Sequence, residues 1–249
     1  MPATKQSTTR RHIALAATVL ALSLAVVVAL LTTGGDESSG RSEGSSPVST
    51  PSARPDDSSG QGPDLSHLAR RDAGDPMALG QTDAPVVLIE YADFQCPFCG
   101  KFARETEPEL IRDYVKKGVL RIEWRNFPVF GQESEQAALA AWAAAQQNTF
   151  WEFHELIYSQ ERARNSGVFT PDNLVDFARK AGVPDLEKFR NDMNSKAARE
   201  ALQRDKEEGY RLGVTSTPAF LVNNTPILGA MPAPTFEKAV EKAAKEAKR

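Results

Sequence analysis

The two cysteines of this chain constrain its fold more than any other feature. They are the only ones among 249 residues, and only Pro97 and Phe98 separate them. The apolar, β-branched run of residues 86–89 precedes them and predicts a buried strand. Pro97 suits the first position of a helix, so Cys96 should lie at a helix N-terminus. The fold must therefore join a buried strand to a helix at Cys96.

The pattern after the cysteines predicts a βαβ unit. Pro108 should interrupt the first helix, the helical period resumes over residues 110–115, and Gly118 ends it. Residues 120–125 alternate apolar and charged side chains, which predicts a half-buried strand. Strand, helix and strand in this order are the sequence form of a βαβ unit.

Helices and a hairpin are predicted for the rest of the domain. Thr170 should cap a helix that begins at Pro171 and closes at Gly182. Asn223 and Asn224 predict a hairpin turn between two short strands. The other predicted elements are helices at about 136–147, 150–158 and 185–212, strands at 219–222 and 226–229, and a closing helix from residue 234. The predicted fold class is α/β.

The first quarter of the chain predicts a membrane anchor and a tether. Residues 13–31 carry no charge, and a helix of this length would span about 29 Å, the thickness of a bilayer core. The basic residues before it predict that residues 1–12 stay in the cytoplasm and that the remainder lies outside. Residues 32–63 are rich in Ser, Gly and Pro, as in a disordered linker. Residues 64–249 have the length of one domain.

Two other interpretations of the apolar segment stay open. A cleaved signal peptide has an apolar core of about 7–15 residues and a small-residue cleavage site. Here the core is longer, and residues 30–34 lack such a site. The pair Arg10-Arg11 is also compatible with a twin-arginine signal. We favour an uncleaved signal-anchor.

Composition excludes several classes of protein. The chain has 30 basic and 33 acidic residues and a net charge of −3, so no basic surface for nucleic acid is expected. Two cysteines are too few for a disulfide-rich scaffold or a four-thiolate zinc site. His154 lies in an aromatic-rich helix, where we expect it to pack rather than to serve as a ligand or a base.

The spacing of Cys96 and Cys99 predicts redox chemistry. The partial positive charge of a helix N-terminus should stabilise a Cys96 thiolate and lower its pKa. Cys99, one turn further on, should be buried and act as the resolving thiol. A purely structural disulfide that closes so short a loop would add only about 2 kcal/mol to the free energy of unfolding. A metal site would need two more ligands, so we favour a redox-active pair without a metal.

These features resemble the DsbA-like branch of the thioredoxin superfamily. The resemblance rests on Cys96-Pro97-Phe98-Cys99 after an apolar strand and on the sequence Gly-Val-Thr-Ser-Thr-Pro at 213–218. Residues 126–128 and 150–154 also look like this family. The resemblance covers about residues 77–247 and is closest to the membrane-anchored oxidoreductases of Gram-positive bacteria. It implies a thioredoxin fold with an α-helical domain inserted at about 133–212.

The resemblance also implies roles for residues near the cysteines. Pro218 matches a cis-proline that faces the pair and leaves a backbone edge free for a substrate strand. Thr217, before it, is the position that tunes redox poise and substrate release. Glu90 matches a buried acid that could exchange a proton with Cys99; the alternative is a carboxylate that reaches solvent at the strand end.

Phe98 departs from the family archetype, which has histidine there. A neutral ring cannot stabilise the Cys96 thiolate by charge, so its pKa should be lowered less and the disulfide should be less oxidising. The resemblance implies a monomeric enzyme without a cofactor that oxidises exported proteins with free cysteines and is reoxidised by a quinone-linked membrane partner. The alternatives are a reductase or isomerase using the same site, and a non-catalytic tethered chaperone or adaptor.

Overall fold

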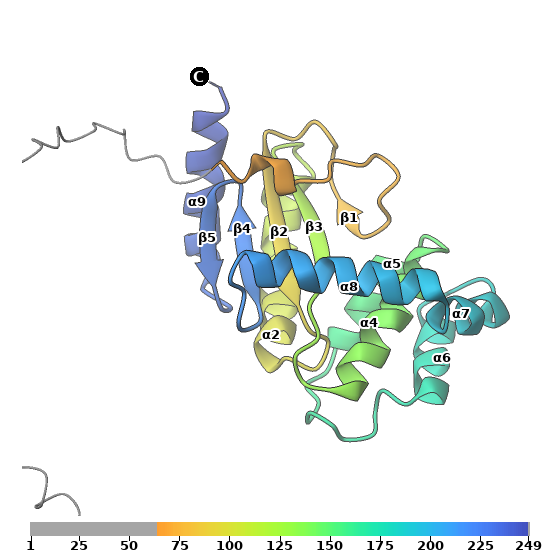
Figure 1. Ribbon diagram of the computed structural model, residues 1–249. Helices are drawn as coiled ribbons and strands as arrows, with labels where there is room; N and C mark the ends of the chain where they lie inside the picture. Colours follow the sequence, from red (N-terminus) through yellow and green to blue (C-terminus); the bar gives the residue numbers. More distant parts are fainter. Residues whose placement is uncertain (1–63, 249) are drawn as a thin grey trace, which may run out of the picture. The chain divides into compact units, whose positions relative to one another are not determined.

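The computed structural model describes residues 64–248 (Figure 1). The predicted cytoplasmic tail (1–12), anchor (13–31) and linker (32–63) lie outside the described residues. Within residues 64–248, no helix combines the length and the apolar character needed to cross a membrane.

Five strands form one mixed sheet in the order β1-β3-β2-β4-β5. The central strand β2 (Val86–Ala92) is buried along its whole length, as its apolar run predicts. It pairs in parallel with β3 (Leu120–Asn126) and antiparallel with β4 (Ala219–Val222). The short strands β1 (Ala78–Leu79) and β5 (Thr225–Leu228) form the two edges. Because β2 and β3 are parallel, their carboxyl ends meet at the same edge of the sheet.

One face of the sheet is covered by the first helical region and the closing helix. The helix predicted after the cysteines is divided into α2 (Pro97–Glu105), α3 (Glu107–Leu110) and the π-helical η2 (Ile111–Val115). The break precedes Pro108, as predicted, because proline is tolerated only in a first helical turn. The closing helix is α9 (Ala233–Glu246). The core under these helices includes Val86, Leu88, Phe102, Leu110, Phe220, Phe236 and Val240.

Five helices lie between β3 and β4, in the part of the chain for which the helical insertion is predicted. The helical run predicted for 185–212 consists of two helices, because the Ser195 side chain accepts a hydrogen bond from the Ala198 N–H at 3.0 Å and begins a new helix. The five are α4 (Gln132–Ala145), α5 (Phe150–Tyr158), α6 (Pro171–Lys180), α7 (Leu186–Met193) and α8 (Lys196–Arg211).

The prediction that β3 is half-buried is wrong. Its charged residues Arg121, Glu123 and Arg125 are at most 3% exposed. They are covered by α8 and by the segment before β1, which contains the short 3₁₀-helix η1 (Ser66–Leu68). Alternation in a sequence shows which side chains share a face, but it does not show whether that face meets water or another segment.

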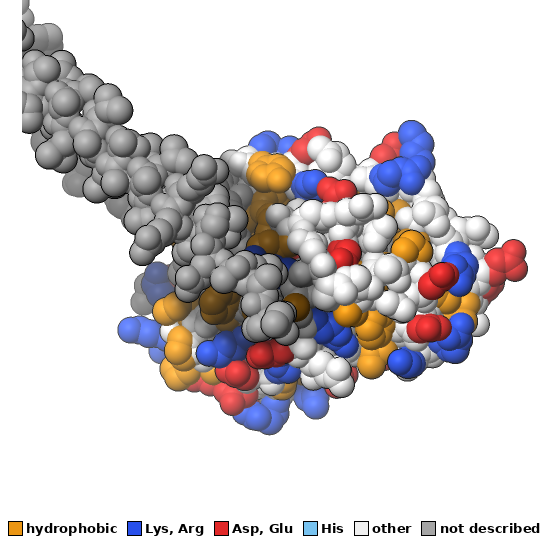
Figure 2. All heavy atoms as spheres, turned by 90° about the horizontal axis from the view of Figure 1, so that it is seen from below, with side chains coloured by type: hydrophobic (Ala, Val, Ile, Leu, Met, Phe, Trp, Pro, Cys, Tyr) orange, Lys and Arg blue, Asp and Glu red, His pale blue; other side chains and the backbone are white. Residues whose placement is uncertain are grey.

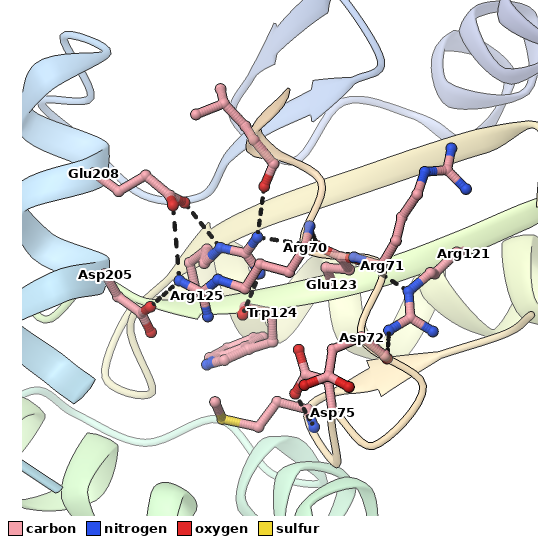
Figure 3. A network of polar contacts seen from close by, with 12 residues as sticks. Arg70, Arg71, Asp72, Asp75, Arg121, Glu123, Trp124, Arg125, Asp205 and Glu208 are labelled. Atoms are coloured by element: carbon pink, nitrogen blue, oxygen red, sulfur yellow. Dashed lines mark hydrogen bonds and ion pairs between the residues drawn. The ribbon is translucent and has the colours of Figure 1, made fainter. Parts of the chain in front are cut away.

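An ion-pair network stabilises this buried face (Figure 3). Glu123 accepts hydrogen bonds from the side chains of Arg121 (2.9 Å) and Arg125 (3.0 Å). It also accepts the backbone N–H groups of Arg70 (3.0 Å) and Arg71 (2.9 Å). Four donors on one carboxylate hold the pKa of Glu123 below its usual value although burial opposes this.

The network extends to α8 and thereby joins three segments that are distant in the sequence. Arg125 donates to Glu208 at 2.8 Å and to the carbonyl of Leu68 at 3.0 Å. Arg70 donates to Asp205 at 2.6 Å. The segment before β1, strand β3 and helix α8 are therefore held together by paired charges, as buried charges must be.

Glu123→Gln should destabilise the domain by about 3 kcal/mol, because it removes the negative charge that two buried arginine side chains, Arg121 and Arg125, share. The loss is measured as a lower midpoint of urea unfolding. Asp172→Asn is the control, because it breaks an exposed pair with Arg190 and should change the midpoint little. Equal midpoints for the two variants would show that the buried network contributes nothing specific.

Candidate functional site

Cys96 lies where the buried strand β2 passes into α2, at the N-cap position of that helix. Its N–H donates to the carbonyl of Asp93 at 2.9 Å, and its carbonyl accepts from the N–H of Gly100 at 3.1 Å. Cys99 lies one turn into α2 and is fully buried. Both cysteines are free thiols in this structure. The sequence-based prediction thus placed both residues correctly in the helix.

Two polar residues before Cys96 form hydrogen bonds that link the junction of β2 and α2 to the helical insertion. The Asp93 carboxylate accepts from the N–H groups of Gln95 (2.8 Å) and Val129 (2.7 Å). The Gln95 side chain donates to Ser134 on α4 at 2.9 Å and accepts the N–H of Asn165 at 2.6 Å. The sequence analysis missed these positioning residues. Their signal was the presence of two polar side chains directly after a buried strand.

The loop before β4 is brought to Cys96 by the sheet, across 121 residues of sequence. The Thr217–Pro218 peptide bond is cis, as the resemblance implied. The Cys96 thiol donates to the carbonyl of Thr217 at 3.2 Å. The carbonyl of Pro218 accepts a hydrogen bond from the N–H of Gly229 at 2.9 Å. The structure therefore places both Thr217 and Pro218 beside the cysteine pair.

The pKa values of the two cysteines are shifted in opposite directions. A hydrogen bond from the Cys99 thiol, supported by the N–H groups of Cys99 and Phe98, lowers the pKa of Cys96 to about 6 although partial burial opposes this. Burial, with Cys96 adding to it, raises the pKa of Cys99 well above its usual value. At neutral pH Cys96 is therefore a thiolate and Cys99 a thiol. This asymmetry is what a nucleophile and its resolving thiol require.

Glu90 is 1% exposed, so the alternative that it reaches solvent is wrong. Neither of its carboxylate oxygens has a hydrogen-bond partner within the described part of the chain. Burial, followed by the nearby Glu107 and Cys96, raises the pKa of Glu90 well above its usual value. The sequence analysis missed Glu107, which is also buried and whose pKa is raised to about 8 by burial and by Glu155.

His154 is buried in an aromatic cluster, as predicted. Its ring packs edge-on against Trp124, with ring centroids 5.0 Å apart, and against Tyr158 at 4.9 Å. Burial lowers the pKa of His154 to about 3, so the ring is neutral at pH 7. Its Nδ1 atom lies 3.9 Å from a carboxylate oxygen of Glu107.

The surface around Cys96 is apolar on one side and grooved on the other. Phe98 is 62% exposed next to Cys96, and Leu228 and Met231 are exposed on either side of Gly229. A groove of about 290 Å³ runs beside Cys96, between the start of α2 and the segment after α5. Figure 2, seen from the lower side of Figure 1, shows hydrophobic side chains lying among charged ones on this side of the domain.

The comparison with known families decides the assignment. A family model described as thioredoxin matches residues 72–242. The chain is 31% identical over 175 residues to a probable disulfide bond formation protein D of Bacillus cereus, covering 68% of this chain and 79% of the relative. The chain is a DsbA-like thiol:disulfide oxidoreductase of the thioredoxin superfamily. This assignment makes the chain a protein disulfide oxidoreductase.

Solved structures and a second group of relatives extend the comparison. The oxidised form of BdbD from Bacillus subtilis superposes with a TM-score of 0.64 at 26% identity, over 69% of this chain and 94% of that one. A Na⁺/H⁺ antiporter of Salinispora tropica is 34% identical over 146 residues, which is 58% of this chain but only 21% of the antiporter. This DsbA-like domain is thus similar to one part of a larger membrane protein.

Cys99→Ala should raise the pKa of Cys96 from about 6 toward its usual value, because the Cys99 thiol is the main hydrogen-bond donor to the Cys96 sulfur. Cys99→Ser keeps a donor and should retain much of the lowering. The midpoint is measured from thiolate absorbance or from the rate of alkylation against pH. Identical midpoints for the two variants would contradict this origin of the low pKa.

Proposed function

We propose that this oxidoreductase introduces disulfides into exported proteins with free cysteines, outside the cytoplasm. The observation that carries the proposal is the opposite acidity of Cys96 and Cys99, because a stable Cys96 thiolate favours the reduced product and makes the disulfide oxidising. Residues 13–31 would anchor the protein in the cell membrane, and residues 32–63 would tether a monomeric catalytic domain to that anchor. No cofactor is needed, since both electrons are held by the two sulfurs.

The reaction begins with the pair as a disulfide. A substrate thiolate attacks the sulfur of Cys96, the Cys96–Cys99 bond breaks, and Cys99 leaves and takes up a proton. A second substrate thiolate then attacks the substrate sulfur of the mixed disulfide and releases the Cys96 thiolate. Two electrons have passed from the substrate to the pair, and a membrane partner linked to quinone would remove them again.

The surrounding residues support this cycle. Pro97 begins α2, so the free N–H groups of the first turn of this helix face Cys96. The exposed Phe98 offers an apolar contact to an unfolded substrate. Thr217 and Pro218 present backbone to a substrate strand beside the sulfur. Glu90, buried below α2, would exchange the proton of Cys99.

A reductase or isomerase is the second candidate, and Phe98 is the observation that favours it. The pKa of Cys96, about 6, lies between the values of about 3.5 for DsbA and about 7 for thioredoxin. A tethered chaperone or adaptor without redox activity is a third possibility, but it would need neither thiol. A Cys99→Ala variant whose Cys96 thiolate attacks no substrate disulfide, and so traps no mixed disulfide with an oxidised substrate, would favour that third possibility.

The reduction potential of the Cys96–Cys99 pair decides between oxidase and reductase. We expect a value well above the roughly −270 mV of thioredoxin, because the Cys96 thiolate is stabilised. The potential is obtained by equilibrating the domain with glutathione redox buffers. A value at or below that of thioredoxin would overturn the oxidase proposal and leave the reductase.

Phe98→His should lower the pKa of Cys96 further and raise the reduction potential, because a partly charged ring would lie beside the thiolate. Phe98→Leu is the matched control: it keeps the position neutral and should leave both quantities near those of the unchanged protein. The two variants are compared by thiol titration and by redox equilibration. A potential that is equal in both would show that position 98 does not set the redox poise here.

A further inference from the structure

Buried polar side chains without hydrogen-bond partners among the described residues gather where β2, α3 and α5 meet in the core. Within residues 64–248, several buried polar side-chain atoms lack a hydrogen-bond partner, and most of them lie between β2 and α5. A buried polar group without a partner is costly unless it serves a purpose or contacts water. The atoms in question are both carboxylate oxygens of Glu90, Oε1 of Glu107, Nε2 of His154 and Nε1 of Trp151.

These groups end at a cavity. A space of about 500 Å³ lies between the α2–α3 region and α5, and Glu107, His154 and Trp151 all contribute to its wall. The exposed side chain of Glu155 also lines it, so the cavity reaches the surface. A cavity of this size, lined by polar atoms that lack protein partners, has room and hydrogen-bonding sites for several waters.

Glu90 connects Cys99 to this cavity. Its side chain lies on the same face of β2 as Leu88, the face that α2 and α3 cover. Glu90 lies in register with Trp124 on β3, the Trp124 ring lies 5.0 Å from that of His154, and His154 Nδ1 lies 3.9 Å from a carboxylate oxygen of Glu107. In keeping with this placement, the Glu107 charge raises the pKa of Glu90, and the Glu90 charge raises that of Cys99. Of these three buried groups, Glu107 alone lines the cavity.

We propose that Glu90 and Glu107 carry the proton of Cys99 to and from the cavity between α3 and α5. Glu107 is then a positioning residue for the proton, since it acts on Cys99 through Glu90. The inference rests on the proposed exchange at Cys96, because only that exchange requires Cys99 to gain and lose a proton.

The burial of the pair gives the physical reason for such a route. Cys99 is 0% and Glu90 1% exposed, so neither exchanges a proton with bulk water directly. A substrate joined to Cys96 would cover the remaining approach from the groove. Cys96 does not line the cavity beside Glu107, so a proton path through that cavity stays open while the mixed disulfide exists.

Ring closure is the step in which the Cys96–Cys99 disulfide re-forms from the mixed disulfide, and its proton balance follows this path. In the mixed disulfide Cys99 is a thiol, and it must lose its proton before its sulfur attacks Cys96 and expels the partner thiolate. Both acids are mainly protonated at pH 7, so Glu107 first releases its proton to water in the cavity, Glu90 then passes its own proton to Glu107, and the Glu90 carboxylate so formed takes the proton of Cys99. In the opposite direction the same groups supply the proton that Cys99 takes up when the disulfide opens.

Several charged and titratable groups face Glu107 and affect its protonation. They are Glu90 on β2, Arg104 on α2, Lys116 after η2, and His154, Glu155 and Tyr158 on α5. His154 is neutral at pH 7 and forms no ion pair with Glu107. Burial and the Glu155 charge raise the pKa of Glu107 to about 8, which suits a group that takes and gives protons near neutral pH.

The test is the rate of ring closure in the full chain. Reduced protein is mixed with oxidised glutathione, and the formation and decay of the glutathione mixed disulfide are followed by acid quench and mass spectrometry from pH 5.5 to 9. Glu107→Gln should slow the decay about tenfold or more at pH 7 and leave its formation unchanged, because formation needs only the Cys96 thiolate. Added imidazole, a small base that can enter the cavity, should restore part of the rate. Glu109→Gln, on the same helix, is the control.

A surface variant tests the path without altering the core. Glu155→Gln removes a charge that raises the pKa of Glu107, so the pH profile of ring closure should shift to lower pH. Glu152→Gln, exposed on the same helix and outside the cavity, should leave the profile in place. An unshifted Glu155→Gln profile, or a Glu107→Gln variant that closes as fast as Glu109→Gln or slows both steps equally, would overturn the proposal.

These outcomes are independent of the direction of electron flow. Ring closure with glutathione occurs in an oxidase and in a reductase alike, so a low reduction potential would reject the proposed oxidase and leave the proton path in place. Conversely, unchanged closure in both Glu107→Gln and Glu155→Gln would reject the path while the potential still supported the oxidase.

Discussion

The burial of Cys99 is the constraint on which the active site depends. Because β2 passes directly into α2, the first helical turn holds Cys99 in the core and leaves Cys96 at the N-cap, at the edge of the core. A thiol that is costly to ionise remains a hydrogen-bond donor, and the Cys96 sulfur beside it is the acceptor. One desolvated group therefore produces both the nucleophile and the resolving thiol.

A buried acidic side chain is paired on one face of the sheet and unpaired on the other. On one face Glu123 is satisfied by two arginine side chains and two backbone N–H groups, and the result is a joint between three segments. On the other face Glu90 has no partner, and its carboxyl group is held largely in the neutral form. Paired charge stabilises the domain, whereas the unpaired acid beside Cys99 is available for proton exchange.

Much of the fold could be predicted because local signals agreed with it. The apolar run of β2, the proline at the start of α2 and the break before Pro108 all have local causes, and each is found in the structure. The errors arose where a distant segment decides the outcome. The alternating strand β3 is buried because α8 and the segment before β1 cover it, and the helical run at 185–212 breaks at a serine cap. Glu107 was missed because an acid in a helix is ordinarily solvated.

By itself, the sequence was enough to predict the chemistry: two cysteines three apart at a strand–helix junction are typical of a redox pair, and spacing and helix position are local properties. The tertiary structure decided the environment of that pair. Only the sheet brings Thr217 to Cys96 across 121 residues, and only the tertiary packing places Glu107 beside His154 of α5 and in the wall of a cavity. Acidity follows burial and neighbouring charge, and both arise from contacts that no local pattern contains.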